Sequence, residues 1–165
     1  AALTHDLGKG LTPADILPAH HGHEERSVRL VAALSERWRV PRDCADLAVH
    51  VAAEHGKLAN IATLRAATVH DLLMTVDAIR RPERFAQMLD ACEADKCSRP
   101  GMAGPFPPRD AALAALAAMR SVDAGAIAAK LAAQSGAARI ADDVRQARIS
   151  AIKASRAAAG SPEES

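Results

Sequence analysis

Apolar and polar positions follow a helical period over much of the chain. In residues 24–38 (EERSVRLVAALSERW), apolar side chains recur every three or four positions, at Val28, Val31, Leu34 and Trp38. This spacing places them on one face of a helix, with the charged residues on the opposite face. We therefore predict an amphipathic helix over residues 24–38, followed by Pro41.

Three further segments of the first hundred residues show the same period. Residues 42–55 (RDCADLAVHVAAEH) predict a helix that ends at Gly56, since glycine commonly follows the last residue of a helix. Residues 68–79 and 82–99 predict two more, with Pro82 in a first turn, where proline is tolerated. No segment alternates with the period of a strand, so we predict an all-α fold.

The composition changes near residue 100. The stretch PGMAGPFPPRD contains four prolines and two glycines, which predicts a linker over residues 101–109 between a domain at 1–100 and the rest of the chain. Alanine dominates residues 110–158. Because alanine favours helix but buries little area, this part predicts a loosely packed helical tail. Residues 159–165 are predicted to be disordered.

Composition and charge exclude several classes of protein. The chain has 165 residues, of which 49% are hydrophobic, enough for a domain with a core. With 21 Lys and Arg against 20 Asp and Glu, any contact with nucleic acid must come from a local patch. Three cysteines without Cys-x-x-Cys spacing favour neither a disulfide framework nor a zinc-thiolate site. Without an apolar run near the length of a membrane span, we expect a cytoplasmic protein without membrane contact.

The candidate chemistry lies in the histidines. All but one of the seven fall in the first 55 residues, and imidazole with aspartate oxygens is a common ligand set for divalent metal ions. His5 and Asp6 follow an apolar run and precede Gly-Lys-Gly, whereas the pair His70-Asp71 has no glycine turn after it.

Helical geometry separates two of the remaining histidines. His50 and His55 are five residues apart, which is a rotation of about 140° on a helix. We therefore expect only one of them, His55 at the helix end, to face a shared site. His50 and His70 are interpreted as ordinary surface or core residues.

Four stretches in order, AALTHDLGKG, HHGHEERS, VAAEH and CEADKCSR, resemble the HD-domain phosphohydrolase superfamily. The residues between them are similar to the C-terminal HD domain of bacterial CCA-adding enzymes, the multifunctional tRNA nucleotidyltransferases. The resemblance covers about residues 1–99 and implies an HD-domain helical bundle with an Ala-rich helical extension. A stringent-response or cyclic-nucleotide HD enzyme would share the His-Asp pair but not LTPADILPAHHGHEERS.

This resemblance implies a site for a divalent ion, Ni²⁺ or Mg²⁺. Its implied ligands are His5, Asp6, His23, His55 and Asp95. Lys9 follows the His-Asp pair and would contact a substrate phosphate, so His5, Asp6 and Lys9 form the implied catalytic set. His20 matches a position that is often histidine in the closer family and ranks below the others as a ligand.

The activity implied by the resemblance is phosphohydrolysis through a metal-activated water. Its substrates would be 2′,3′-cyclic nucleotides, 2′-nucleotides and phosphates at the tRNA 3′ end, within a parent protein that adds CCA to tRNA. The superfamily carries a further histidine on a helix before the His-Asp pair. We therefore expect this chain to be part of a longer protein and to lack that first helix.

Two interpretations of the last third remain open. Arg145 and Arg148 lie near one face of a predicted helix and would form an RNA-binding stripe, although Asp142 and Asp143 also fit a solvated face. Alternatively, apolar faces in 113–119 and 127–133 would make the chain a non-catalytic module that dimerises the parent enzyme or positions tRNA.

Overall fold

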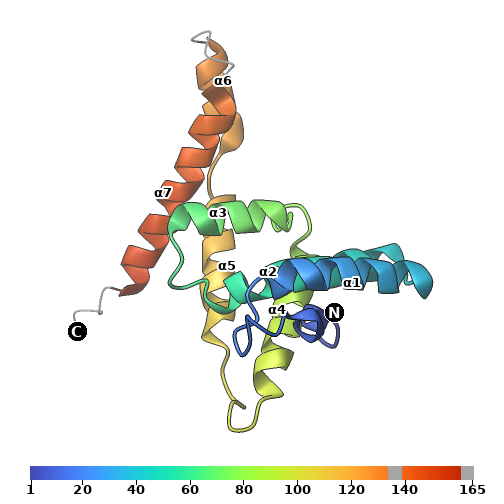
Figure 1. Cartoon of the computed structure of the whole chain (residues 1–165). Coiled ribbons are helices and arrows are strands. Elements are labelled where there is room, and N and C mark those ends of the chain that lie inside the picture. Colours follow the sequence, from blue (N-terminus) through green and yellow to red (C-terminus); the bar gives the residue numbers. More distant parts are fainter. Residues whose placement is uncertain (134–138, 161–165) are drawn as a thin grey trace. The chain divides into compact units, whose positions relative to one another are not determined.

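The computed structural model describes residues 1–133 and 139–160. In this part of the chain every regular element is a helix, so the predicted all-α class is confirmed (Figure 1). The chain folds as two compact units. Residues 1–60 and 81–109 form the first unit, and residues 61–80 join the chain from Asp110 onward in the second.

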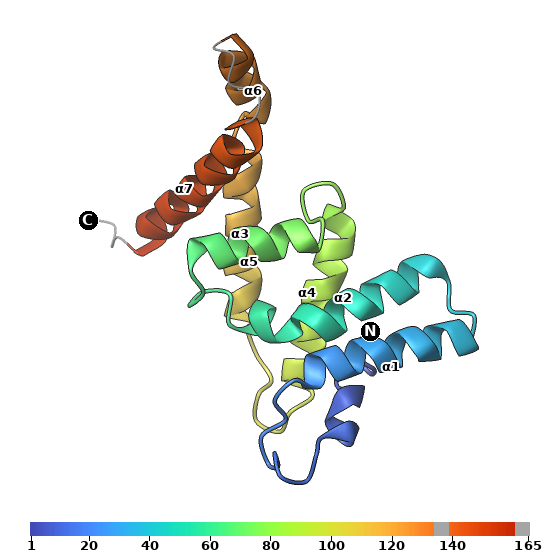
Figure 2. The same ribbon diagram turned by 45° about the horizontal axis from the view of Figure 1, so that its top comes forward.

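The first unit is built on a helical hairpin. Helices α1 (His23–Arg37) and α2 (Arg42–Ala59) lie side by side and are joined by a short turn (Figure 2). The short 3₁₀ helix η1 (Leu7–Leu11) packs against α1, and α4 (Pro82–Cys97) packs against α2. Fully buried side chains of this unit include Val31, Val51, Leu58, Phe85, Met88 and Leu89. Of the apolar face predicted for residues 24–38, Val31 is buried and Val28 packs against it, whereas Trp38 lies just past the end of α1 and is 67% exposed, so that part of the prediction is wrong.

The end of α2 differs from the prediction. The helix passes through Gly56 and ends at Ala59, so Gly56 is not its terminator. A Cβ at residue 56 would lie 3.4 Å from Oε1 of Glu24, an ordinary contact, so residue 56 is a regular position inside the helix. His55 is consequently an interior residue of α2 and not a helix-end residue. Pro82 is the first residue of α4, as predicted.

The second unit contains the remaining helices. These are α3 (Ala66–Thr75), most of α5 (Pro107–Arg120), α6 (Ala124–Ala133) and α7 (Ile140–Gly160). Helix α7 packs against both α3 and α6. Arg156 of α7 donates hydrogen bonds to the carbonyls of Leu64 at 2.6 Å and Ile61 at 2.7 Å, which anchors the segment before α3.

Several boundaries in this unit also differ from the prediction. Helix α3 ends at Thr75 instead of residue 79. Helix α5 begins at Pro107, inside the predicted linker, because prolines are tolerated in a first helical turn. Residues 159 and 160 belong to α7, and the rest of the tail predicted to be disordered, 161–165, lies outside the described residues.

One segment is more apolar than the sequence analysis allowed. By length and composition alone, Pro107–Ala132 is long and apolar enough to cross a membrane. The structure interrupts it between Arg120 and Ala124, so α5 has 14 residues and α6 has 10. Each helix is shorter than the roughly 20 residues that a spanning helix needs.

Candidate metal centre

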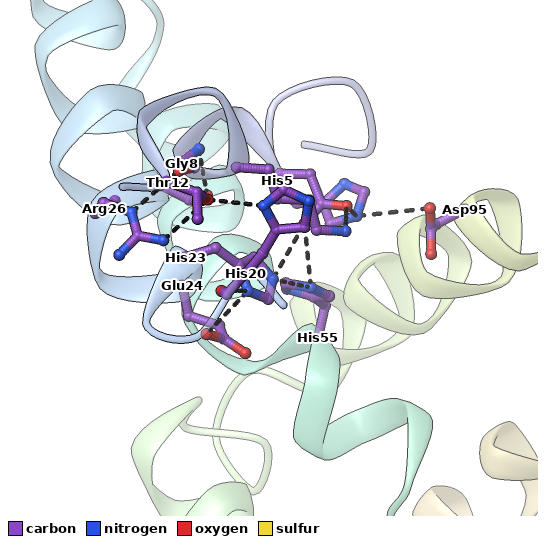
Figure 3. Close-up of polar contacts among 12 residues, drawn as sticks. His5, Gly8, Thr12, His20, His23, Glu24, Arg26, His55 and Asp95 are labelled. Carbon is purple, nitrogen blue, oxygen red and sulfur yellow. Dashed lines mark hydrogen bonds and ion pairs between the residues drawn. The ribbon is translucent and has the colours of Figure 1, made fainter. Parts of the chain in front are cut away.

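Residues from four separate segments converge in the first unit. His5 and Asp6 lie in the turn before η1, His23 is the first residue of α1, His55 lies in α2 and Asp95 lies in α4 (Figure 3). The exposed fraction of these side chains ranges from 7% for His5 to 28% for Asp6. The structure therefore brings together all five residues that the resemblance implied as ligands.

Asp6 lies at the centre of this group. Its Oδ1 is 3.2 Å from Nε2 of His23 and 3.6 Å from Nε2 of His55. Nε2 of His5 is 3.3 Å from Oδ2 of Asp6 and 3.6 Å from Oδ1 of Asp95. The tightest subset is His5, Asp6 and His55, whose potential ligand atoms all lie within 4.8 Å of one another.

The hydrogen bonds of the three imidazoles fix which nitrogen faces the centre. Nδ1 of His5, His23 and His55 hydrogen-bonds the main-chain carbonyls of Ala2 at 2.6 Å, His20 at 2.9 Å and Val51 at 3.1 Å, respectively. A carbonyl can only accept, so each Nδ1 donates, and in a neutral ring Nε2 then carries a lone pair. Metal-binding histidines are commonly oriented in this way.

Two buried atoms at the centre lack hydrogen-bond partners. They are Nε2 of His5 and Oδ1 of Asp6. Buried polar atoms in proteins are almost always hydrogen-bonded, so these two atoms require an explanation. Imidazole nitrogens and carboxylate oxygens that face one another without protons between them fit a shared divalent cation. The residues present therefore fit a metal ion.

The electrostatics favour the ligand forms of Asp6 and His55. Burial raises the pKa of Asp6, but the hydrogen bond from Lys9 and the charge of His5 outweigh it and hold the pKa below its ordinary value. Burial, helped by the charge of His5, lowers the pKa of His55. Near neutral pH Asp6 is thus ionised and His55 is neutral, as metal ligation requires.

Each of the two carboxylates is also held by a cation. Nζ of Lys9 is 2.5 Å from Oδ2 of Asp6, and Nη2 of Arg99 is 2.5 Å from Oδ2 of Asp95. Each carboxylate therefore has Oδ2 on a cation and Oδ1 near a histidine, and Oδ2 of Asp6 also lies close to Nε2 of His5. A role for Lys9 was predicted from the sequence, whereas none was predicted for Arg99. The signal was present in the four-residue spacing from Asp95, which brings two side chains together on a helix.

Gly8 allows η1 to approach α1 closely enough to place the His-Asp pair. A Cβ at residue 8 would overlap the carbonyl oxygen of His23 and lie 2.5 Å from the main-chain nitrogen of Ser27. Instead, the amide of Gly8 donates to Oγ of Ser27 at 2.9 Å, and Nε of Arg26 donates to the carbonyl of Gly8 at 3.1 Å. The glycine that follows the pair in the sequence is therefore a packing requirement.

His20 supports the site without joining the converging group. Its Nδ1 shares a 2.7 Å hydrogen bond with Oγ1 of Thr12, and its carbonyl accepts from His23 (Figure 3). Oγ1 of Thr12 also accepts from Nη2 of Arg26 at 3.2 Å. His20 thus orients the ring of His23.

Other residues singled out in the sequence lie elsewhere. His70 and Asp71 belong to α3 in the second unit, where Asp71 accepts a 2.8 Å hydrogen bond from His70 and pairs with Arg145 at 2.9 Å. Arg148 donates to Sδ of Met74 at 3.7 Å. Arg145 and Arg148 are thus both engaged by α3 and lie outside the unit that holds the site.

The cysteines do not contribute to the centre. Cys44 and Cys97 are exposed, and Cys92 is buried. Burial raises the pKa of the Cys92 thiol to about 12, so this group stays protonated near neutral pH and is a poor ligand or nucleophile.

Comparisons with known proteins agree with this geometry. A family model described as the HD domain matches residues 1–95. The chain is 54% identical over 153 residues to a protein from Burkholderia multivorans named "Multifunctional CCA protein", and 52% identical to proteins of that name from Burkholderia cenocepacia and Burkholderia vietnamiensis. These alignments cover 92–93% of this chain but 37% of each relative, so the chain spans little more than a third of their length. No solved structure gives a significant match.

Proposed function

The chain belongs to the HD domain family, and from that premise we propose that it is the metal-dependent phosphohydrolase part of a CCA-adding enzyme. One observation above all supports this proposal. Three imidazoles expose Nε2 toward the carboxylate of Asp6, while each Nδ1 is committed to a carbonyl. A cluster of acceptors with two buried, unpartnered atoms suits a cation better than any neutral ligand.

The proposed roles follow the contacts. His5, Asp6, His23, His55 and Asp95 would hold the divalent ion, for which Ni²⁺ and Mg²⁺ are the candidates. When bound, such an ion supplies a Lewis acid that activates water and neutralises charge developing on a phosphoryl group. Lys9 holds Asp6 ionised and, with its side chain 38% exposed, can also donate to a substrate phosphate.

The proposed substrates are phosphoesters of the kind found at RNA 3′ ends. The relatives are named for CCA, and the resemblance to CCA-adding enzymes implies tRNA, so 2′,3′-cyclic nucleotides and terminal phosphates of tRNA are the natural candidates. CCA addition would be an activity of the longer parent protein, with this chain hydrolysing phosphates at the same tRNA end.

Hydrolysis of 2′,3′-cyclic AMP tests this function. The purified chain is freed of metal with a chelator and assayed with Ni²⁺, Co²⁺, Mn²⁺ or Mg²⁺ added singly. We expect metal-dependent hydrolysis, and we expect Asp6→Asn to reduce it at least about 100-fold, because the variant keeps the side-chain shape but loses the charge that holds the ion.

The chain offers a matched control in its second His-Asp pair. Asp71→Asn makes the same chemical change outside the converging group, so it is expected to leave hydrolysis within about twofold. Circular dichroism establishes that both variants are folded. Equal activity of Asp6→Asn and the unmodified chain would reject the proposed site.

A further inference from the structure

A second cluster of charge lies in the unit that does not contain the metal centre. Arg145, Lys153 and Arg156 of α7, together with Arg65 immediately before α3, line a groove of about 580 Å³. The groove's other lining residues are Ala66, Ala67, Gln146 and Ile149, so it contains no acidic side chain among the described residues.

The α7 residues reach this groove through helical spacing. Arg145, Ile149 and Lys153 follow one another at four-residue intervals, and Arg156 follows three residues later. Such intervals put side chains on one face of a helix. Arg148, which the sequence analysis paired with Arg145, lines a different hollow beside Asp77 and Arg80. The sequence therefore indicated a basic face on α7, and of the two arginines it named, Arg145 lines this groove.

Much of the positive charge in the groove is uncompensated. Arg145 pairs with Asp71, but Arg156 is held by two neutral carbonyls, which orient the guanidinium without cancelling its charge. Within residues 1–133 and 139–160, neither Arg65 nor Lys153 forms an ion pair. Arginine has five N–H donors, so Arg145 and Arg156 both retain donors for a further acceptor.

We propose that this groove binds the phosphate backbone of RNA. The proposal rests on the proposed function, which makes the tRNA 3′ end the substrate of the same chain. Cations that follow a groove along one helix suit a polymer with regularly spaced phosphates better than a single small anion. Contacts of this kind position RNA and carry no sequence information. The groove therefore supplies affinity for the phosphate backbone of the RNA, whereas the metal centre acts on a phosphoester.

The groove is tested by RNA binding to the full chain. A fluorescein-labelled tRNA transcript is titrated by fluorescence anisotropy at several salt concentrations, using the unmodified chain and an Arg65→Glu, Lys153→Glu double variant. These two residues are chosen because Arg145 and Arg156 also hold α3 and its preceding segment in place. We expect the double variant to bind at least about tenfold more weakly, with a salt slope shallower by about two.

A matched charge reversal provides the control. Lys130→Glu changes an exposed lysine of α6 that does not line the groove, and it should leave affinity within about twofold. Equal binding by the double variant and the unmodified chain would overturn the proposal, as would an equal loss in Lys130→Glu. Groove-dependent binding to phosphatidylserine vesicles in place of tRNA would also overturn it.

The two proposals fail separately. If the groove proposal holds, the double variant still hydrolyses 2′,3′-cyclic AMP, because a mononucleotide needs no contact with the RNA body, and Asp6→Asn still binds tRNA. If the double variant lost hydrolysis but kept its affinity for tRNA, the groove would act in hydrolysis and not in RNA binding, which would contradict the proposal.

Discussion

At the scale of single residues, the candidate metal centre depends on which atom of each side chain is already engaged. The three histidines use Nδ1 on main-chain carbonyls, and the two aspartates use Oδ2 on Lys9 and Arg99. The Nε2 and Oδ1 atoms converge, and Oδ2 of Asp6 contacts Nε2 of His5 as well as Lys9. The partners of the ligands therefore matter as much as the ligands, because they decide which lone pairs reach an ion.

Arg99 provides a test of this dependence. Its side chain is 57% exposed, so its pair with Asp95 contributes at most about 1 kcal/mol to folding. If it orients Asp95 toward the ion, Arg99→Ala should weaken divalent-metal binding at least about tenfold, measured by isothermal titration calorimetry, with the thermal midpoint of the metal-free chain unchanged. Arg99→Lys keeps the charge and should recover part of the affinity.

The control for Arg99 is another exposed cation in an ion pair. The side chain of Arg29 is 77% exposed and pairs with Glu25 on α1, away from the converging residues. Arg29→Ala should change neither metal affinity nor stability. Metal affinity of Arg99→Ala equal to that of Arg29→Ala would show that the ion pair with Asp95 is only a surface contact.

At the scale of elements, the site requires η1 to lie against the start of α1. Gly8 makes this approach possible, since any Cβ there would collide with backbone atoms of His23 and Ser27. The sequence indicated a glycine turn after the His-Asp pair, but not its purpose. The role of Gly8 depends on the close packing of η1 against α1. This packing is a tertiary contact, so the local pattern of apolar and polar residues cannot predict it.

Gly8→Ala is therefore expected to destabilise the chain by about 1–3 kcal/mol, because the backbone of α1 must move to admit the methyl group. Urea denaturation followed by circular dichroism measures the change in the free energy of unfolding. The same substitution at Gly10, also in η1, meets no atom within 4 Å and should change the free energy of unfolding by less than about 0.5 kcal/mol. Equal stability of the two variants would contradict the role assigned to Gly8.

Helix existence was predictable from the sequence, whereas helix ends and partners were not. The three- and four-residue spacing correctly indicated α1, and Pro82 correctly marked the start of α4. Gly56 failed as a stop signal because a glycine weakens a helix only modestly, and α2 continues through it to Ala59. The ligand set could be proposed only through resemblance, since no spacing rule brings Asp95 next to His5 across 90 residues.

At the scale of the whole molecule, the change in composition marks one boundary between the units but not the others. The proline-rich stretch predicted a boundary over residues 101–109, and the second unit does resume at Asp110, but that unit also takes in residues 61–80. Arg145 pairs with Asp71, and Arg120 donates to the carbonyl of Ile79 at 2.9 Å. The second unit is therefore assembled from two separated segments, which composition along the chain cannot reveal.

This arrangement predicts that residues 1–109 do not form a self-sufficient domain. Removing residue 110 onward takes away the helix against which α3 packs and leaves the carbonyls of Ile61 and Leu64 without Arg156. We expect the shortened chain to unfold about 10 °C or more below the full chain in differential scanning calorimetry, with increased binding of a hydrophobic dye. An independent helical tail would instead leave the melting of 1–109 cooperative and unshifted. The same comparison decides how the activity of shortened chains can be interpreted. If residues 1–109 melt at a lower temperature, a loss of hydrolysis in that shortened chain would reflect unfolding of residues 61–80 and not a missing catalytic group.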